Sequence, residues 1–238
     1  MNKRDFNTLF VALNIFKPCP IHFNYDNYFT NYKSYFIEYQ IYLKKAKKTI
    51  VNNKQLIVLF LESGPENSDN YIFSSLTNQI NPASDSFLWN ICKGFGLDPR
   101  EKTKETCLIW LYSRDVPVLI IDLFPFHGIN LSKKKNKTSY RSLILHKFKR
   151  DQNSFITALK DPIDILRPFK GDKIFLFGVP NSFWNSFGGP GKGSIWLTDL
   201  KKKSGPLGGY SNKTNIVNVG GQTISSAAIK SWCEIERV

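Results

Sequence analysis

The sequence is poor in the residues that build metal centres and disulfide frameworks. Its 238 residues include only four cysteines, scattered along the chain, and three histidines. No Cys-x-x-Cys pair occurs, which argues against a zinc or iron–sulfur site, and four scattered cysteines are too few for a disulfide framework. We therefore expect a protein without metal or cofactor that works in a reducing cytoplasm.

Long apolar runs and common catalytic loops are also missing. No stretch of about 18 apolar residues occurs, so the sequence predicts no membrane contact through a spanning helix. The first 20 residues contain Asp5 and end near Lys17-Pro18, which favours a first helix over a secretory signal. The chain has no Gly-x-Ser-x-Gly elbow, and its glycine-rich residues 186–194 do not match the Walker A spacing.

Acidic residues are few compared with basic ones. Lys and Arg number 33 against 19 Asp and Glu, a net charge of +14. This excess favours a polyanionic partner, nucleic acid first and an acidic membrane surface second. With 42% hydrophobic residues the chain can bury a core. We expect one monomeric domain over residues 1–238, with residues 1–50 as a helical segment packed on it.

Apolar runs alternate with helical patterns along the chain. The runs, rich in β-branched residues, are residues 56–61, 116–121, 173–180 and 215–219. Helical spacing covers residues 32–48, 86–95, 140–149 and 154–166. Continuous apolar runs are typical of strands covered on both faces. The alternation predicts an α/β fold, a three-layer α/β/α domain with a central four-stranded parallel sheet.

In such a sheet, ligands bind beyond the carboxyl ends of the strands. The segments that follow the four runs are residues 62–70, 122–127, 179–184 and 220–226. The second of them leads into residues 132–150, which hold eight basic residues and no acid. These positive charges could neutralise phosphates beside the site, although a solubilising loop is the alternative. The glycine-rich loop around Lys192 could also approach a nucleic-acid backbone, or be a plain surface loop.

Several segments, in this order, resemble the uracil-DNA glycosylase superfamily. Residues 62–74 read ESGPENSDNYIFS, residues 86–93 read SFLWNICK, residues 118–122 read VLIID and residues 175–180 read FLFGVP. The resemblance covers about residues 55–235 and implies that superfamily's fold and excision of a base from DNA. The sequence departs from the superfamily at residues 220–226, where GGQTISS lacks the expected histidine, and it also lacks the cluster-binding cysteines of iron–sulfur members.

The resemblance implies roles for individual residues. Glu62 or Asp69 would be the catalytic acid that orients water and stabilises the sugar cation, and His127 could cover for the missing histidine. Base-binding residues would be Gly64, Pro65, Phe73, Asp122 and Trp184, of which Trp184 could instead be a core residue. Contacts to the DNA backbone would come from Lys133, Lys134, Lys135, Lys137, Lys192, Gln222, Thr223 and Ser225.

Asp122 stands where the superfamily has a base-reading asparagine. An asparagine amide both donates and accepts, whereas an ionised aspartate only accepts. An acceptor pairs with an exocyclic amine such as N4 of cytosine, so a modified cytosine fits better than uracil. If the substrate is a modified cytosine, we expect a role in defence against phage. The alternative is that Asp122 only caps a turn. Two other functions stay open: a non-enzymatic nucleic-acid-binding protein, and an enzyme acting on free nucleotides.

Overall fold

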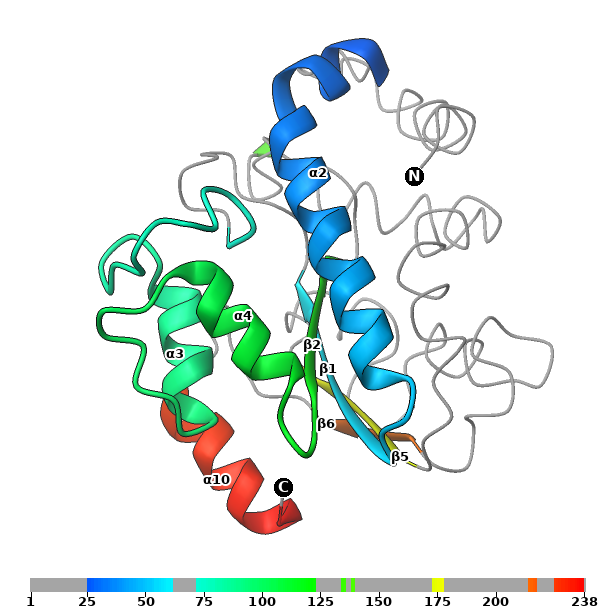
Figure 1. The fold of residues 1–238 in the computed structure, drawn as a ribbon, viewed down its shortest axis with the longest axis vertical. Coiled ribbons are helices and arrows are strands. Elements are labelled where there is room, and N and C mark those ends of the chain that lie inside the picture. The colour runs from blue at the N-terminus through cyan, green and yellow to red at the C-terminus, as the bar shows by residue number, and fades with distance from the viewer. Residues whose placement is uncertain are drawn as a thin grey trace, which may run out of the picture.

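The computed structural model describes residues 25–61, 72–122, 134–135, 138–139, 173–177, 214–217 and 225–237 of the 238-residue chain (Figure 1). Within these residues the protein is a mixed α/β structure, as the sequence predicts. Its elements are named by the labels of Figure 1. The expected helix at the start of the chain and the helical patterns of residues 140–149 and 154–166 lie outside the described residues.

Four parallel strands form one sheet in the order β2-β1-β5-β6. The strands are β1 (Gln55–Leu61), β2 (Val118–Asp122), β5 (Lys173–Phe177) and β6 (Thr214–Val217). Each lies within or beside one of the four apolar runs. All five residues of β2 are buried, and Leu56, Ile57, Val58 and Leu59 of β1 have no exposed surface. A strand that is buried on both faces needs apolar side chains at every position, which explains the continuous rather than alternating pattern.

The helix α2 (Tyr25–Ile50) is longer than the predicted residues 32–48 and closes the outer edge of the sheet. Its residues Tyr39 and Tyr42 are buried, and their hydroxyl oxygens accept the backbone N–H groups of Asp122 and Ile120 at 3.0 and 2.9 Å. Because β2 is an edge strand, alternate N–H groups would otherwise lack an acceptor. Burial raises the pKa of Tyr42, so its phenol stays protonated.

Three further helices lie near the sheet: α3 (Ser86–Gly94), α4 (Lys104–Tyr112) and α10 (Ser226–Glu236). The sequence predicts α3, and the other two were not predicted. Both begin at a hydroxyl cap: the Thr103 side chain accepts from the Thr106 N–H, and the Ser225 side chain accepts from the Ala228 N–H, each at 3.1 Å.

The C-terminal helix α10 packs on α3 (Figure 1) through a close approach at Gly94. A Cβ atom at Gly94 would lie only 2.6 Å from the Cβ of Ile229, which has no exposed surface. Glycine is therefore required here by space rather than by backbone conformation. This contact attaches residues 225–237 to the first half of the chain.

The described residues contain no helix long and apolar enough to cross a membrane. Among them, no group of three or more His, Cys, Asp or Glu side chains is placed to hold a metal ion. Cys92 and Cys107 are buried free thiols that hydrogen-bond to each other between α3 and α4, and Cys233 is also free.

Candidate functional site at the carboxyl ends of β1 and β2

The carboxyl ends of β1 and β2 lie side by side. Leu61, the last residue of β1, is paired with Asp122, the last residue of β2. Leu61 is the residue that precedes Glu62, and Glu62 itself lies outside the described residues. In folds with a parallel sheet, ligands bind at the carboxyl ends of the strands, where the strands lead into loops.

Asp122 is held firmly at this edge. Only 4% of its surface is exposed, and its backbone N–H donates to the Tyr39 hydroxyl at 3.0 Å. Its negative charge, after burial, is one of the factors that raise the pKa of Tyr42. Because so little of Asp122 is exposed, a base could reach it only through a narrow opening or after a local movement.

Phe73 lies in the core rather than on a surface. Its side chain has no exposed area, and its ring centroid lies 4.7 Å from that of Tyr39 and 4.8 Å from that of Tyr42. A ring that is covered on this scale offers no face to a nucleobase. In this structure Phe73 supports the tyrosine that holds Asp122, so its expected stacking on a base has no geometric support.

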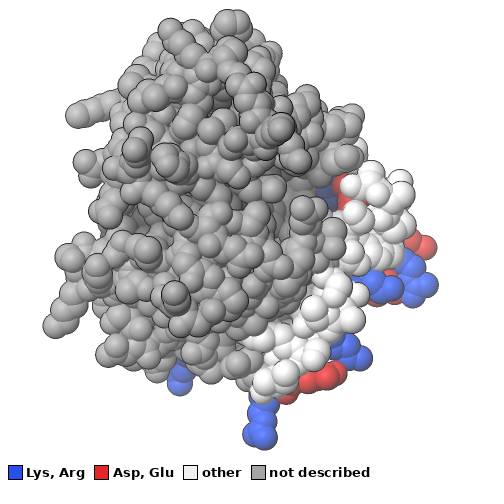
Figure 2. Space-filling view, turned by 180° about the vertical axis from the view of Figure 1, so that it is seen from behind, with Lys and Arg blue, Asp and Glu red and all other residues white. Residues whose placement is uncertain are grey.

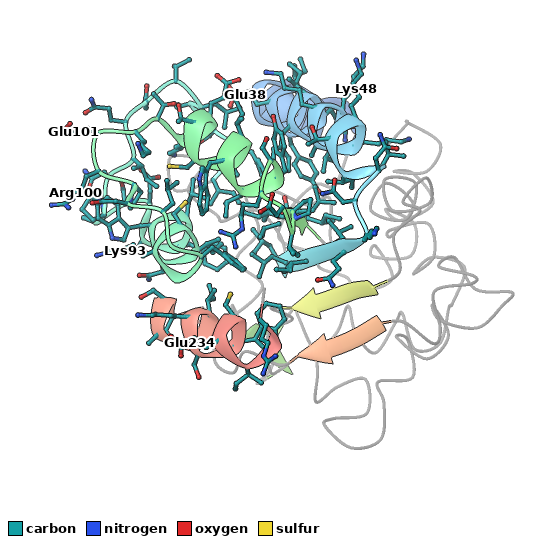
Figure 3. The ribbon with its side chains drawn as sticks, turned by 60° about the horizontal axis from the view of Figure 1, so that its bottom comes forward. Glu38, Lys48, Lys93, Arg100, Glu101 and Glu234 are labelled. Carbon is teal, nitrogen blue, oxygen red and sulfur yellow. The ribbon has the colours of Figure 1, made fainter. Side chains whose placement is uncertain are left out.

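The sequence predicts Tyr39 as one of the aromatic residues on one side of a helix, but neither Tyr39 nor its neighbour Glu38 was predicted to lie at the site. Tyr39 joins Phe73 to the backbone of Asp122. Glu38 lies on the side of α2 toward α4 (Figure 3), and its Oε2 atom is buried without a hydrogen-bond partner. A tyrosine at helical spacing from Tyr42 was a visible signal of a buried face, but its bond to an edge strand was not.

The pKa of Glu38 is raised above its usual value. Burial is the main cause, since it disfavours the charged carboxylate, and the charge of Glu105 acts in the same direction. A hydrogen bond from the Ser75 backbone and the charge of Lys104 partly oppose this rise. Glu38 is thus a partly buried carboxylate next in sequence to the tyrosine that holds Asp122.

A buried ion pair fixes the beginnings of α3 and α4. The Lys104 ammonium lies 2.8 Å from Oδ1 of Asp85, and both side chains are only 4% exposed. The other carboxylate oxygen of Asp85 accepts the Asn81 N–H at 2.9 Å. Two charges removed from water in this way are stable only as a pair, so each partner specifies the position of the other.

Few of the predicted DNA-backbone residues are described. Lys134 and Lys135 form the strand β3 (Lys134–Lys135), which pairs antiparallel with β4 (Thr138–Ser139). Ser225 is the exposed cap of α10, and its hydroxyl oxygen accepts the Ala228 N–H at 3.1 Å. The predicted residues outside the described part of the chain are Glu62, Gly64, Pro65, Asp69, His127, Lys133, Lys137, Trp184, Lys192, Gln222 and Thr223.

Comparison of the chain with protein-family models, with curated proteins and with solved structures finds no match. The resemblance to uracil-DNA glycosylases therefore rests on the segments quoted from the sequence. Of the residues that it singles out, the described structure brings together Phe73 and Asp122, and it does so through Tyr39 rather than through a shared surface.

Proposed function

We propose that this chain is a DNA glycosylase that flips a modified cytosine out of DNA and hydrolyses its N-glycosidic bond. The observation that carries the proposal is the pairing of Leu61 with Asp122. Leu61, the residue before Glu62, lies beside the buried Asp122 at the end of the sheet where parallel sheets bind ligands. The proposal includes a three-layer α/β/α fold of the uracil-DNA glycosylase type and a monomer in the cytoplasm.

The reaction needs a carboxylate near the sugar. As the bond between C1′ and the base nitrogen breaks, positive charge develops on the sugar, and a water oxygen then bonds to C1′. Glu62 or Asp69 would stabilise that charge and orient the water. His127 would stabilise the departing base, and the lysines of residues 133–137 would hold phosphates. These contacts offset the few kcal/mol that it takes to unstack the base.

Asp122 would select the base. An ionised carboxylate accepts hydrogen bonds only, so it suits the exocyclic amine of a cytosine rather than O4 of uracil. A surface that is 4% exposed strengthens such a bond, because water competes little for the carboxylate. The bond from Asp122 N–H to Tyr39 keeps the end of β2 in place while the side chain contacts the base.

The test is base release from DNA under single-turnover conditions. Oligonucleotides carry uracil, cytosine, hydroxymethylcytosine or glucosylated cytosine, and abasic sites are scored by alkaline cleavage. Glu62→Gln or Asp69→Asn should abolish turnover while DNA binding survives, and Asp122→Asn should shift preference from cytosine derivatives toward uracil. Glu234→Gln, an exposed acid on α10, is the control and should change neither property. If Asp122→Asn left the base preference unchanged, Asp122 would not be the residue that recognises the base.

A nucleic-acid-binding protein without excision activity is the second candidate. Two observations favour it: Phe73 has no exposed ring face, and residues 220–226 contain no histidine. Such a protein would bind DNA with a steep dependence on salt and release no base. The same oligonucleotides separate the two candidates, because binding and base release are measured on one sample.

A further inference from the structure

The end of α2 carries an exposed group of lysines that the proposed base site does not use. Lys44, Lys47 and Lys48 lie in its last two turns, and Lys54 follows just before β1. We call these four residues the α2 lysine surface. All four are exposed, and Figure 3 shows Lys48 projecting away from the rest of the molecule. Residues three and four apart on a helix share a face, so Lys44 lies beside both Lys47 and Lys48.

Glu105 and Asp115 are acids of the described residues that lie close to this surface: Glu105 pairs with Lys45, and the Asp115 backbone oxygen accepts from the Asn53 amide. Residues 44–54 contain no acid, and within the part of the chain that the structure describes none of the four lysines forms an ion pair. Lys45, which lies among them, is engaged with Glu105 at 2.9 Å. Elsewhere the described surface mixes both signs (Figure 2), as in the ion pair between Arg100 and Asp98.

Helix stability explains this surface only in part. Lys47 and Lys48 in the last turn interact favourably with the negative end of the helix dipole. Lys44, however, repels both of them across one helical turn, and like charges at this spacing destabilise a helix. Lys54 lies beyond the helix end and gains nothing from the dipole. An anion bound to these lysines would remove the repulsion between Lys44 and its neighbours.

Part of the α2 lysine surface, Lys48 and Lys54, lies toward the end of the sheet opposite the base site. α2 ends at Ile50 and β1 begins at Gln55, whereas Asp122 is level with Leu61 at the other end of β1. A seven-residue strand is about 20 Å long, so Lys54, just before β1, is well separated from Asp122. Lys44 is nearer, because it follows Tyr39, whose hydroxyl binds the Asp122 N–H, by five residues on α2. Lys173, the first residue of β5, pairs with Gln55, the first residue of β1, so it lies at the amino end of the strands.

We propose that the α2 lysine surface is a second nucleic-acid contact that holds the phosphate backbone without reading bases. Exposed lysines close together in the chain match a polymer with regularly spaced phosphates, and such contacts carry no sequence information. Insertion into a membrane needs a broad apolar helix face. On α2, Tyr42, Leu43 and Ala46 are buried, and among its described side chains only Ile37 and Ile41 are large, apolar and exposed. The proposal rests on nucleic-acid binding but not on base excision.

The experiment measures binding of a fluorescein-labelled random duplex of about 30 base pairs by anisotropy, at about 50 to 200 mM salt. A variant with Lys44→Gln, Lys47→Gln, Lys48→Gln and Lys54→Gln should lower the slope of log Kd against log salt by about 2 to 4, since each phosphate contact contributes about 0.9. The same four positions changed to Arg should keep the slope, because the charge is retained. A matched control changes four exposed basic residues elsewhere to Gln: Lys93, Arg100, Lys230 and Arg237.

A lower slope in the α2 variant alone, with helical content unchanged by circular dichroism, would support the proposal. An equal slope for wild type and α2 variant, or an equal loss in the control, would overturn it. So would binding to phosphatidylserine vesicles without binding to the duplex. Base release is scored separately. If the slope falls but no base is ever released, the second contact stands and the glycosylase proposal fails.

Discussion

The ion pair between Lys104 and Asp85 makes a sharp test of how burial sets the strength of a charge interaction. Its atoms are 2.8 Å apart and both side chains are 4% exposed. The Lys45–Glu105 pair has nearly the same length, 2.9 Å, but its side chains are 51% and 39% exposed. The two pairs differ mainly in burial, so they serve as test and control for one another.

Changing Lys104 to Met should destabilise the protein by about 3 to 5 kcal/mol, because Asp85 is left buried without a counter-charge. The attraction lost is about 6 kcal/mol at 2.8 Å with an effective dielectric constant of about 20, and part of it is offset because the Lys104 ammonium no longer has to be desolvated. Lys45→Met should cost only about 0 to 1 kcal/mol, since water already solvates both of its partners.

The free energy of unfolding is measured by urea titration with tryptophan fluorescence. Adding Asp85→Asn to Lys104→Met should restore most of the loss, because a neutral amide needs no counter-charge and can still accept the Asn81 N–H. A loss below about 1 kcal/mol in Lys104→Met, equal to that of Lys45→Met, would refute the reasoning.

Three more predictions concern the same half of the protein. Gly94→Ala should cost about 1 to 3 kcal/mol by pushing α10 off α3, as urea titration would show; no loss in this variant would contradict the close approach. Tyr39→Phe should cost about 1 to 3 kcal/mol by removing the acceptor of the Asp122 N–H, and amide hydrogen exchange at Asp122 should accelerate; unchanged exchange would argue against that bond. The pKa of Glu38 is raised in the folded protein, so ionisation of Glu38 lowers the stability as the pH rises through that pKa. Glu38→Gln should therefore raise the Tm at neutral pH, and the difference from wild type should vanish below about pH 4. A difference that grows in acid would contradict this sign.

Local patterns predicted the parts of the fold in which periodicity and length agree. The buried runs that became β1 and β2, the aromatic spacing of α2 and the apolar face of α3 all have clear signals. The helix α4 was missed because its residues 107–111, CLIWL, form a short apolar run that periodicity cannot separate from a buried strand. The cap pattern at Thr103 and Thr106 was the available signal.

The site was harder to predict than the fold because it depends on strand order. Nothing in the sequence says that β2 is an edge strand, so the bonds from Ile120 and Asp122 to tyrosines of α2 could not be foreseen. The same packing of α2 covers Phe73, which the sequence places beside a proposed ligand loop. The position of Asp122 at a strand end follows from the apolar run, and the structure agrees.

The most direct test of the central claim is base release by the wild-type protein from DNA that carries uracil, cytosine, hydroxymethylcytosine or glucosylated cytosine. The account predicts abasic sites at a modified cytosine and few or none at uracil. It also predicts that Asp122→Asn moves this preference toward uracil. Tight DNA binding without an abasic site at any of the four bases would contradict the account.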